Sequence, residues 1–92
     1  MSELSLRVVT PNGSHGPFEC DSIHVNVCDS VFGKGGGEYG IRKGHAKAVL
    51  SLNDGKLFAK KEGKTVFSAH CGSGFAMVDQ NKVSVVVEEC ML

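Results

Sequence analysis

The sequence has no excess charge of either sign. Ten basic residues balance ten acidic residues in a chain of 92, so the formal net charge is zero. Domains that bind nucleic acid through bulk electrostatics are usually strongly basic. The composition therefore argues against that class, and we predict no nucleic-acid partner.

Long apolar runs are also missing. No run approaches the ~18 residues that a transmembrane helix needs. The N-terminal residues Met1–Leu4 lack the basic region and apolar core of a signal peptide. We therefore expect a soluble, cytosolic chain. Disulfides are rare in that compartment, which leaves a metal site or free thiols for the four cysteines.

Helical periodicity and internal repeats are absent, and alternation with a period of two takes their place. Ile23, Val25 and Val27 alternate with polar neighbours, which is typical of a half-buried strand. From Asn53 onward, turn formers recur about every eight to ten residues, as in an all-β sandwich or barrel. We predict one domain, residues 1–92, that forms an antiparallel β-sandwich of about ten short strands without C-terminal helices.

The predicted elements follow from the same patterns. Strands are predicted at Leu4–Thr10, Phe18–Cys20, Ser22–Cys28, Ala46–Leu52, Lys56–Lys61, Thr65–Cys71, Phe75–Val78 and Lys82–Val87. Hairpin turns are predicted at Asn53–Gly55, Glu62–Gly63, Gly72–Gly74 and Asp79–Asn81, a loop at Pro11–Pro17, and a short tail at Glu88–Leu92. The predicted sandwich is thus a series of sequential hairpins.

Glycine is concentrated in Asp29–Gly44, which holds six of them in sixteen residues. A stable helix is excluded there, because each glycine costs about 0.8–1 kcal/mol relative to alanine. We expect a loop that carries the function, from Gly35 to Ala46. Its Gly35-x-Gly37-x-x-Gly40 spacing matches the dinucleotide-binding fingerprint, but that motif needs a helix after its last glycine to receive the pyrophosphate. No helix is predicted there, so we expect no nucleotide cofactor.

Cysteine and histidine raise a metal hypothesis. The candidate ligands are Cys20, His24, Cys28, His70 and Cys71. Structural zinc sites usually pair two cysteines two to four residues apart on a tight turn, whereas Cys20 and Cys28 are eight apart. We favour Cys20 and Cys71 as small core residues, and His24 and His70 as surface or interface residues. We predict no metal and no other cofactor. A metal enzyme remains the alternative that metal analysis would test.

Catalytic groups have no signature in the sequence. Nothing local places a nucleophile beside a base and an orienting acid, and we predict no catalytic residue. Arg42, Lys43, His45 and Lys47 form a small basic cluster near Glu38. The residues alone leave two interpretations open, a solvated loop or a polar docking surface for a protein or an anionic membrane edge.

One segment resembles a known family. Residues Gly37–Ala46 resemble the Gly-Glu-x-Gly-Ile-x-x-Gly-His-Ala/Thr segment of the epsilon subunit of F-type ATP synthases. The resemblance continues through nearly the whole chain. Segments similar to strands and turns of that family are Leu6–Pro11, Phe18–Cys20, Gly72–Val78 and Lys82–Val85.

The resemblance implies a non-catalytic rotor subunit in the central stalk of a proton- or sodium-translocating ATP synthase. This family's β-sandwich domain links the gamma subunit to the c-ring, peripheral to the membrane at its cytoplasmic face or in the equivalent organelle compartment. Carried over by position, the residues on the c-ring side are Glu38, Tyr39, Arg42 and Lys43. Those on the gamma side are Thr10, His45 and Leu50.

The sequence departs from the family in three places. The family usually continues into two C-terminal helices, which this chain lacks, so neither inhibition by those helices nor ATP binding is expected. Lys43 and Lys47 stand where the family often has proline, and Asp29–Gly36 is longer than usual. The alternative function is a free-standing β-sandwich interaction module that is not part of a rotary ATPase.

Overall fold

The computed structural model describes residues 4–27 and 37–91. All regular structure in these two ranges is β-strand, so none of it includes a helix that could cross a membrane. The ten strands found there are β1 (Leu4–Thr10), β2 (Gly13–Cys20), β3 (Ser22–Val27), β4 (Gly37–Arg42), β5 (Ala48–Leu52), β6 (Gly55–Lys61), β7 (Lys64–Cys71), β8 (Gly74–Asp79), β9 (Lys82–Val87) and β10 (Cys90–Met91).

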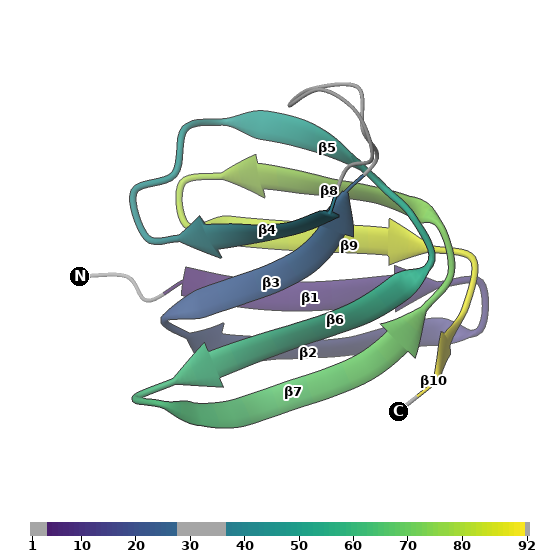
Figure 1. The fold of residues 1–92 in the computed structure, drawn as a ribbon, viewed down its shortest axis with the longest axis horizontal. Coiled ribbons are helices and arrows are strands. Elements are labelled where there is room, and N and C mark those ends of the chain that lie inside the picture. Colours follow the sequence, from purple (N-terminus) through teal and green to yellow (C-terminus); the bar gives the residue numbers. More distant parts are fainter. Residues whose placement is uncertain (1–3, 28–36, 92) are drawn as a thin grey trace.

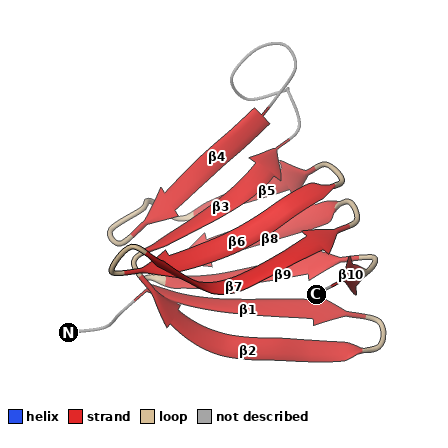
Figure 2. Cartoon of the chain, turned by 60° about the horizontal axis from the view of Figure 1, so that its bottom comes forward, coloured by secondary structure: helices blue, strands red, loops and turns tan. Residues whose placement is uncertain are grey.

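Hydrogen bonds join these strands into one sheet, in which β4 branches off by pairing with β3. The sheet curls into two arms (Figures 1 and 2). The β3 arm has the order β4-β3-β6-β7-β10, and the β8 arm has the order β5-β8-β9-β1-β2. A single pairing, Val27 with Leu52, connects the arms through β3 and β5. The predicted all-β sandwich is confirmed, with one parallel pairing, between β1 and β9.

The core lies between the two arms and follows the predicted alternation. On β3, Ile23, Val25 and Val27 are buried, and both neighbours of Val25 are half-buried polar residues. Away from the β3–β5 junction, Phe18 of β2 packs on Phe67 of β7 with ring centroids 4.8 Å apart. Apolar burial is the main favourable term in folding, so these inward faces hold the arms together.

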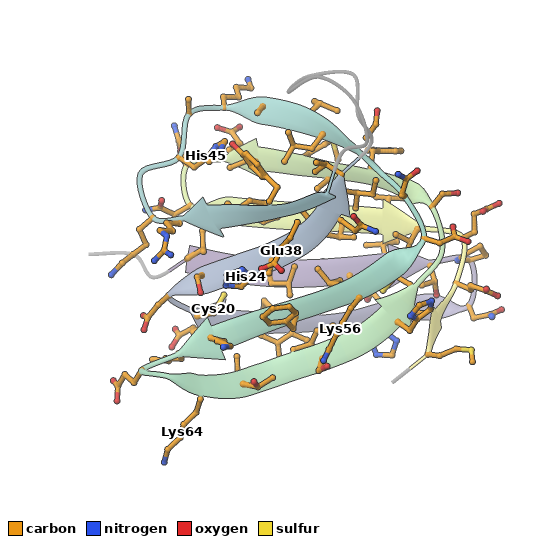
Figure 3. All side chains as sticks on the ribbon, viewed as in Figure 1. Cys20, His24, Glu38, His45, Lys56 and Lys64 are labelled. Atoms are coloured by element: carbon orange, nitrogen blue, oxygen red, sulfur yellow. The ribbon has the colours of Figure 1, made fainter. Side chains whose placement is uncertain are left out.

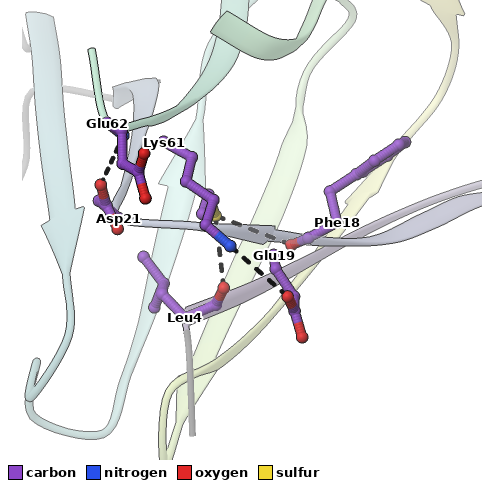
Figure 4. A network of polar contacts seen from close by, with 7 residues as sticks. Leu4, Phe18, Glu19, Asp21, Lys61 and Glu62 are labelled. Carbon is purple, nitrogen blue, oxygen red and sulfur yellow. Dashed lines mark hydrogen bonds and ion pairs between the residues drawn. The ribbon is translucent and has the colours of Figure 1, made fainter. Parts of the chain in front are cut away.

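Polar contacts reinforce the corner between β2 and β3 (Figure 4). The Cys20 thiol donates a hydrogen bond to the Leu4 carbonyl at 3.5 Å. One residue later, the Asp21 carboxylate accepts a hydrogen bond from the Glu62 backbone N–H at 2.7 Å. The turn between β6 and β7 is thereby attached to the start of β3.

The loop predicted at Pro11–Pro17 is wrong for most of its length, because β2 begins at Gly13. The Gly16-Pro17 pair sits where the register between β1 and β2 shifts, between Leu6 and Val8 of β1. Proline is tolerated at bulges and on edge strands, and β2 is the last strand of its arm. Pairing with β1 therefore prevails over the local turn signals.

The glycine-rich loop is also partly a strand. Residues Gly37–Arg42 form β4, which pairs with β3 from Ser22 opposite Arg42 to Val27 opposite Gly37. Ile41 is fully buried and anchors β4 to the core. Residues 29–36 of the glycine-rich prediction, and Cys28 at the end of the predicted strand Ser22–Cys28, lie outside the described residues.

Two of the four predicted hairpins are confirmed. Turns at Glu62–Gly63 and Gln80–Asn81 join β6 to β7 and β8 to β9, which are antiparallel neighbours. Glu62 and Asn81 have positive φ angles, 52° and 65°, as tight hairpin turns require.

The other two predicted hairpins are wrong, since they join strands that do not pair. Asn53–Gly55 carries the chain from the β8 arm to the β3 arm, and Gly72–Gly74 returns it. The predicted tail is wrong as well, because Cys90 and Met91 form β10 against β7. The chain therefore crosses between the arms after β2, β4, β5, β7 and β9, and hairpin signals do not reveal these crossings.

Candidate functional site

The outer face of the β3 arm is polar and built around His24 (Figure 3). The imidazole of His24 stacks on the ring of Phe58 from β6, with centroids 4.5 Å apart and planes 10° from parallel. Its Nδ1 lies 2.9 Å from Glu38 Oε2 on β4, and its Nε2 lies 3.2 Å from Ser22 Oγ. One half-buried ring thus connects three neighbouring strands.

Positive charge surrounds this cluster. Lys56 and Lys60 each place an ammonium group 5.6 Å from the centroid of the Phe58 ring, within cation–π range. Arg42 lies exposed at the end of β4. Because Glu38 is 64% exposed in its side chain, solvent screens its pairing with His24 and the stabilisation is small. The face is better suited to long-range attraction than to holding the fold.

The turn between β4 and β5 is held by side chains. His45 Nδ1 lies 2.7 Å from the Ala46 carbonyl, to which it can only donate. In the neutral imidazole, Nε2 is then the acceptor for the Tyr39 hydroxyl at 2.6 Å. The Gly44 N–H donates to Asn81 Oδ1 at 2.8 Å. The turn is thus joined to the β8–β9 hairpin.

The outer face of the β8 arm carries an apolar patch, bordered by polar residues such as Ser51 and Ser84. Directly paired residues of neighbouring strands share one face of a sheet, and here Val49 pairs with Met77, and Phe75 pairs with Val86, which pairs with Val9. Val49 is 69% exposed, Met77 42% and Phe75 41%. We call these five residues the apolar face. Scattered exposed hydrophobic residues are ordinary, but a contiguous set marks an interaction site.

A hollow of about 450 Å³ deepens one end of the apolar face. Its walls come from the end of β1, the start of β8 and the end of β9. The lining residues are Val9, Thr10, Pro11, Ser73, Gly74, Phe75, Val86, Val87 and Glu88. The hollow is shallow and open to solvent, and its lining is almost entirely apolar.

The structure groups the four residues predicted for the c-ring side. Glu38, Tyr39 and Arg42 belong to β4, and Lys43 follows directly. Glu38, Arg42 and Lys43 are exposed, whereas Tyr39 is half-buried and packs against the core. Together they form one edge of the β3 arm.

The three residues predicted for the gamma side are spread along the β8 arm. His45 precedes β5 near Asn81, whose carbonyl accepts a hydrogen bond from the Ser5 N–H. Thr10 lies five residues beyond Ser5 on β1, which is about 16 Å along a strand. Leu50 is only 6% exposed and faces the core. The structure therefore does not bring the three side chains together, but the apolar face extends between Thr10 and His45.

The residues of the metal and nucleotide hypotheses are dispersed. Among residues 4–27 and 37–91, no group of three or more histidine, cysteine or acidic side chains could hold a metal ion. Cys20 is bonded to a backbone carbonyl, and Cys71 donates its thiol to Cys90. Gly37 and Gly40 of the glycine fingerprint lie within β4 rather than before a helix.

The apolar face is the feature that sequence reasoning missed. Its residues alternate with core residues along β5 and β8, so both faces of these strands look apolar in the sequence. Such a pattern is consistent with burial on both faces. In a two-layer sandwich only one face of each strand lies in the core, so a strand with apolar residues on both faces is a detectable sign of an exposed apolar patch.

Comparison with known proteins gives a consistent family. The family model described as "ATP synthase, Delta/Epsilon chain, beta-sandwich domain" matches residues 3–92. The ATP synthase epsilon chain of Staphylococcus haemolyticus is 36% identical over 88 residues, which cover 96% of this chain and 61% of the relative. That of Staphylococcus aureus is 33% identical and is covered to 60%. The chain thus spans about 60% of the length of these curated relatives.

Solved structures show the same fold. A chain in the Euglena gracilis mitochondrial ATP synthase, solved with OSCP, F1 and the c-ring, superposes with a TM-score of 0.80 at 22% identity, covering 97% of this chain and 52% of that one. A chain in the central stalk and c-ring of the Tetrahymena thermophila mitochondrial ATP synthase gives 0.75 at 12% identity, with 98% and 66% covered.

Proposed function

The chain belongs to the ATP synthase delta/epsilon chain family through its β-sandwich domain, and from that premise we propose that it is a central-stalk rotor subunit. It links the gamma subunit to the c-ring of a proton- or sodium-translocating F-type ATP synthase. Residues 1–92 act as one domain without a catalytic residue. The complex holds it peripherally at the cytoplasmic face of the membrane, or in the equivalent organelle compartment.

The apolar face is the feature that supports the proposed contact with the gamma subunit. Three large side chains on it are at least 41% exposed in the isolated chain. Covering apolar surface releases roughly 25 cal/mol per Å², so a partner would find its main source of affinity there. Thr10 and His45 lie at the two ends of this face, and Leu50 supports β5 from the core side. The gamma subunit would then lie along the β8 arm.

The polar edge of β4 supports the c-ring contact. Glu38, Tyr39, Arg42 and Lys43 lie on the other arm, so one partner does not obstruct the other. Exposed charges of both signs set orientation and association rate more than affinity. A subunit that links two partners is suited by this combination, in which the apolar face supplies affinity and the charged β4 edge fixes orientation.

A binding experiment with matched charge insertions tests the gamma contact. Met77→Glu places a carboxylate in the apolar face, and Ser68→Glu places one on β7 of the opposite arm, where the side chain is also exposed. Both substitutions should leave the circular dichroism spectrum and unfolding midpoint nearly unchanged. Affinity for the purified gamma subunit from the same organism, measured by titration calorimetry, should fall at least about tenfold for Met77→Glu alone.

Two results would contradict the proposal. If the wild-type chain does not bind gamma at all, the alternative of a free-standing interaction module is favoured. If Ser68→Glu weakens binding as much as Met77→Glu, gamma does not use the apolar face. The c-ring contact is tested by reversing the charges of both Arg42 and Lys43. This double variant should weaken c-ring binding and leave gamma binding intact.

A further inference from the structure

Two thiols face each other at the end of the β3 arm. Cys71 of β7 and Cys90 of β10 are paired across the strands, and their sulfur atoms are 3.4 Å apart. The next rung is hydrogen-bonded, because the Gly72 N–H donates to the Glu89 carbonyl at 3.0 Å. The cysteines therefore occupy a non-hydrogen-bonded position, where the Cα atoms of an antiparallel pair are about 4.5 Å apart.

That position suits a disulfide. Cystines span Cα distances of about 4.4–6.8 Å with an S–S bond of about 2.05 Å. The two sulfur atoms need to approach by roughly 1.3 Å from their present separation. We propose that Cys71 and Cys90 form a redox-active pair, which a low-molecular-weight disulfide converts to a cystine that fastens β10 to β7.

The two thiols have different surroundings, which assigns their order of reaction. Cys90 is half-buried and lines a hollow of about 420 Å³ together with Asn12 of the β1–β2 turn and His15 of β2. Cys71 is 4% exposed, and its burial, with the hydrogen bond and Coulomb effect of Cys90, raises its pKa to about 12. Only the thiolate is nucleophilic. Cys90 therefore meets the oxidant first, and Cys71 reacts second.

The reaction is two thiol–disulfide exchanges. The Cys90 thiolate attacks the small disulfide RS–SR, forms a mixed disulfide and releases RS⁻. That RS⁻ takes the proton of Cys71 and leaves as RSH, the Cys71 thiolate attacks the Cys90 sulfur, and the second RS⁻ departs. The two protein thiols are oxidised, and the small disulfide is reduced to two thiols.

The cystine would change how firmly the β10 end is held. β10 has only two paired residues, Cys90 and Met91, so the hydrogen-bonded ladder alone gives it little protection from opening. The covalent link joins positions 19 residues apart and encloses the β8–β9 hairpin. Reversible disulfides of this kind are the form that occurs in reducing compartments.

Peptide mapping of the purified full-length protein tests the proposal. The protein is equilibrated in glutathione buffers with increasing ratios of disulfide to thiol, free thiols are alkylated, and the digest is analysed without reductant. We expect a peptide pair linked through Cys71 and Cys90, lighter by two hydrogen atoms than the reduced pair and separated again by dithiothreitol. Cys20→Ser should keep the link, whereas Cys90→Ser should abolish it.

A second measurement reports on β10 itself. Hydrogen exchange of the Gly72 amide, which bonds the Glu89 carbonyl, should slow by at least about tenfold on oxidation. A stable glutathione adduct on Cys90 with Cys71 unreacted would overturn the proposal. A Cys71–Cys90 link that forms only in denaturant would overturn it too, and both results come from the wild-type chain alone.

Discussion

Gly74 occupies a position where a side chain has no room. It begins β8 between two neighbours, pairing with Leu52 of β5 and with Val87 of β9. A Cβ atom there would lie 1.9 Å from the Val86 carbonyl oxygen and 2.8 Å from the Val87 Cα. Both obstacles are backbone atoms of a central strand, so no rotamer change can move them. Gly74→Ala must therefore push β8 and β9 apart.

The cost can be bounded from these contacts. Overpacking a well-packed interior typically costs about 1–3 kcal/mol, and loss of a neighbouring ladder hydrogen bond adds about 1 kcal/mol. We expect Gly74→Ala to lower the free energy of unfolding by about 3 kcal/mol. At about 4–8 °C per kcal/mol for a domain of this size, the unfolding midpoint should fall by roughly 12 °C or more.

Gly40→Ala is the matched control. Gly40 also lies within a strand, but the nearest atoms to an added Cβ are those of the His24 ring at 3.9 Å, an ordinary contact. The substitution should be neutral or stabilise the fold by up to about 1 kcal/mol, because alanine restricts the unfolded chain. Urea and thermal unfolding followed by circular dichroism measure both variants. The steric explanation is refuted if the free energies of unfolding of Gly74→Ala and wild type differ by less than about 0.5 kcal/mol. It is also refuted if Gly40→Ala loses as much unfolding free energy as Gly74→Ala.

Two further predictions separate structural from docking roles and address pH. Leu50→Ala should lower the free energy of unfolding in urea by about 2–5 kcal/mol, because Leu50 is buried. Val49→Ala should change that free energy by less than about 0.5 kcal/mol and weaken gamma binding. The reverse order would contradict the assignment of Leu50 to the core and of Val49 to the apolar face. The pKa of Cys71 is raised from 9.0 to about 12, so the native state keeps this proton longer than the unfolded chain. The stabilisation of the native state by this protonated thiol is present below pH 9 and is lost as pH rises toward 12. Over that range the free energy of unfolding should fall by up to about 1.4 kcal/mol per pH unit. Under reducing conditions, Cys71→Ala should lack that part of the slope, and identical slopes would be evidence against it.

The strands that were predicted correctly are those whose pattern is local. The alternation of Ile23, Val25 and Val27 identifies a half-buried strand because side chains of a strand alternate between faces. The Glu62–Gly63 turn is equally local, and both strands that it joins are adjacent. Pairing between distant segments has no such signature. The parallel pairing of β1 with β9 joins the two ends of the chain, and β10 is too short to have a period at all.

The same distinction holds for the candidate site. The family resemblance predicts a c-ring contact at Glu38, Arg42 and Lys43, and the structure groups these three as exposed side chains at the β4 edge. The family resemblance does not predict which face of β5 lies in the core, since Leu50 and Val49 are adjacent apolar residues on opposite faces. Which of them is buried depends on the register with β8, and that register is a tertiary property.

The β4–β5 turn has a mechanical consequence for the proposed role of linking two partners. The two arms share one backbone pairing, Val27 with Leu52, at one end of the sandwich. At the opposite end, the hydrogen bond from the Gly44 N–H to Asn81 links the turn to the β8–β9 hairpin. A force on the β4 edge can therefore reach the apolar face through these links as well as through the core. Because both ends are tied, twisting one arm against the other must break such links or deform close-packed apolar side chains, so the connection between the two proposed contact surfaces is stiff.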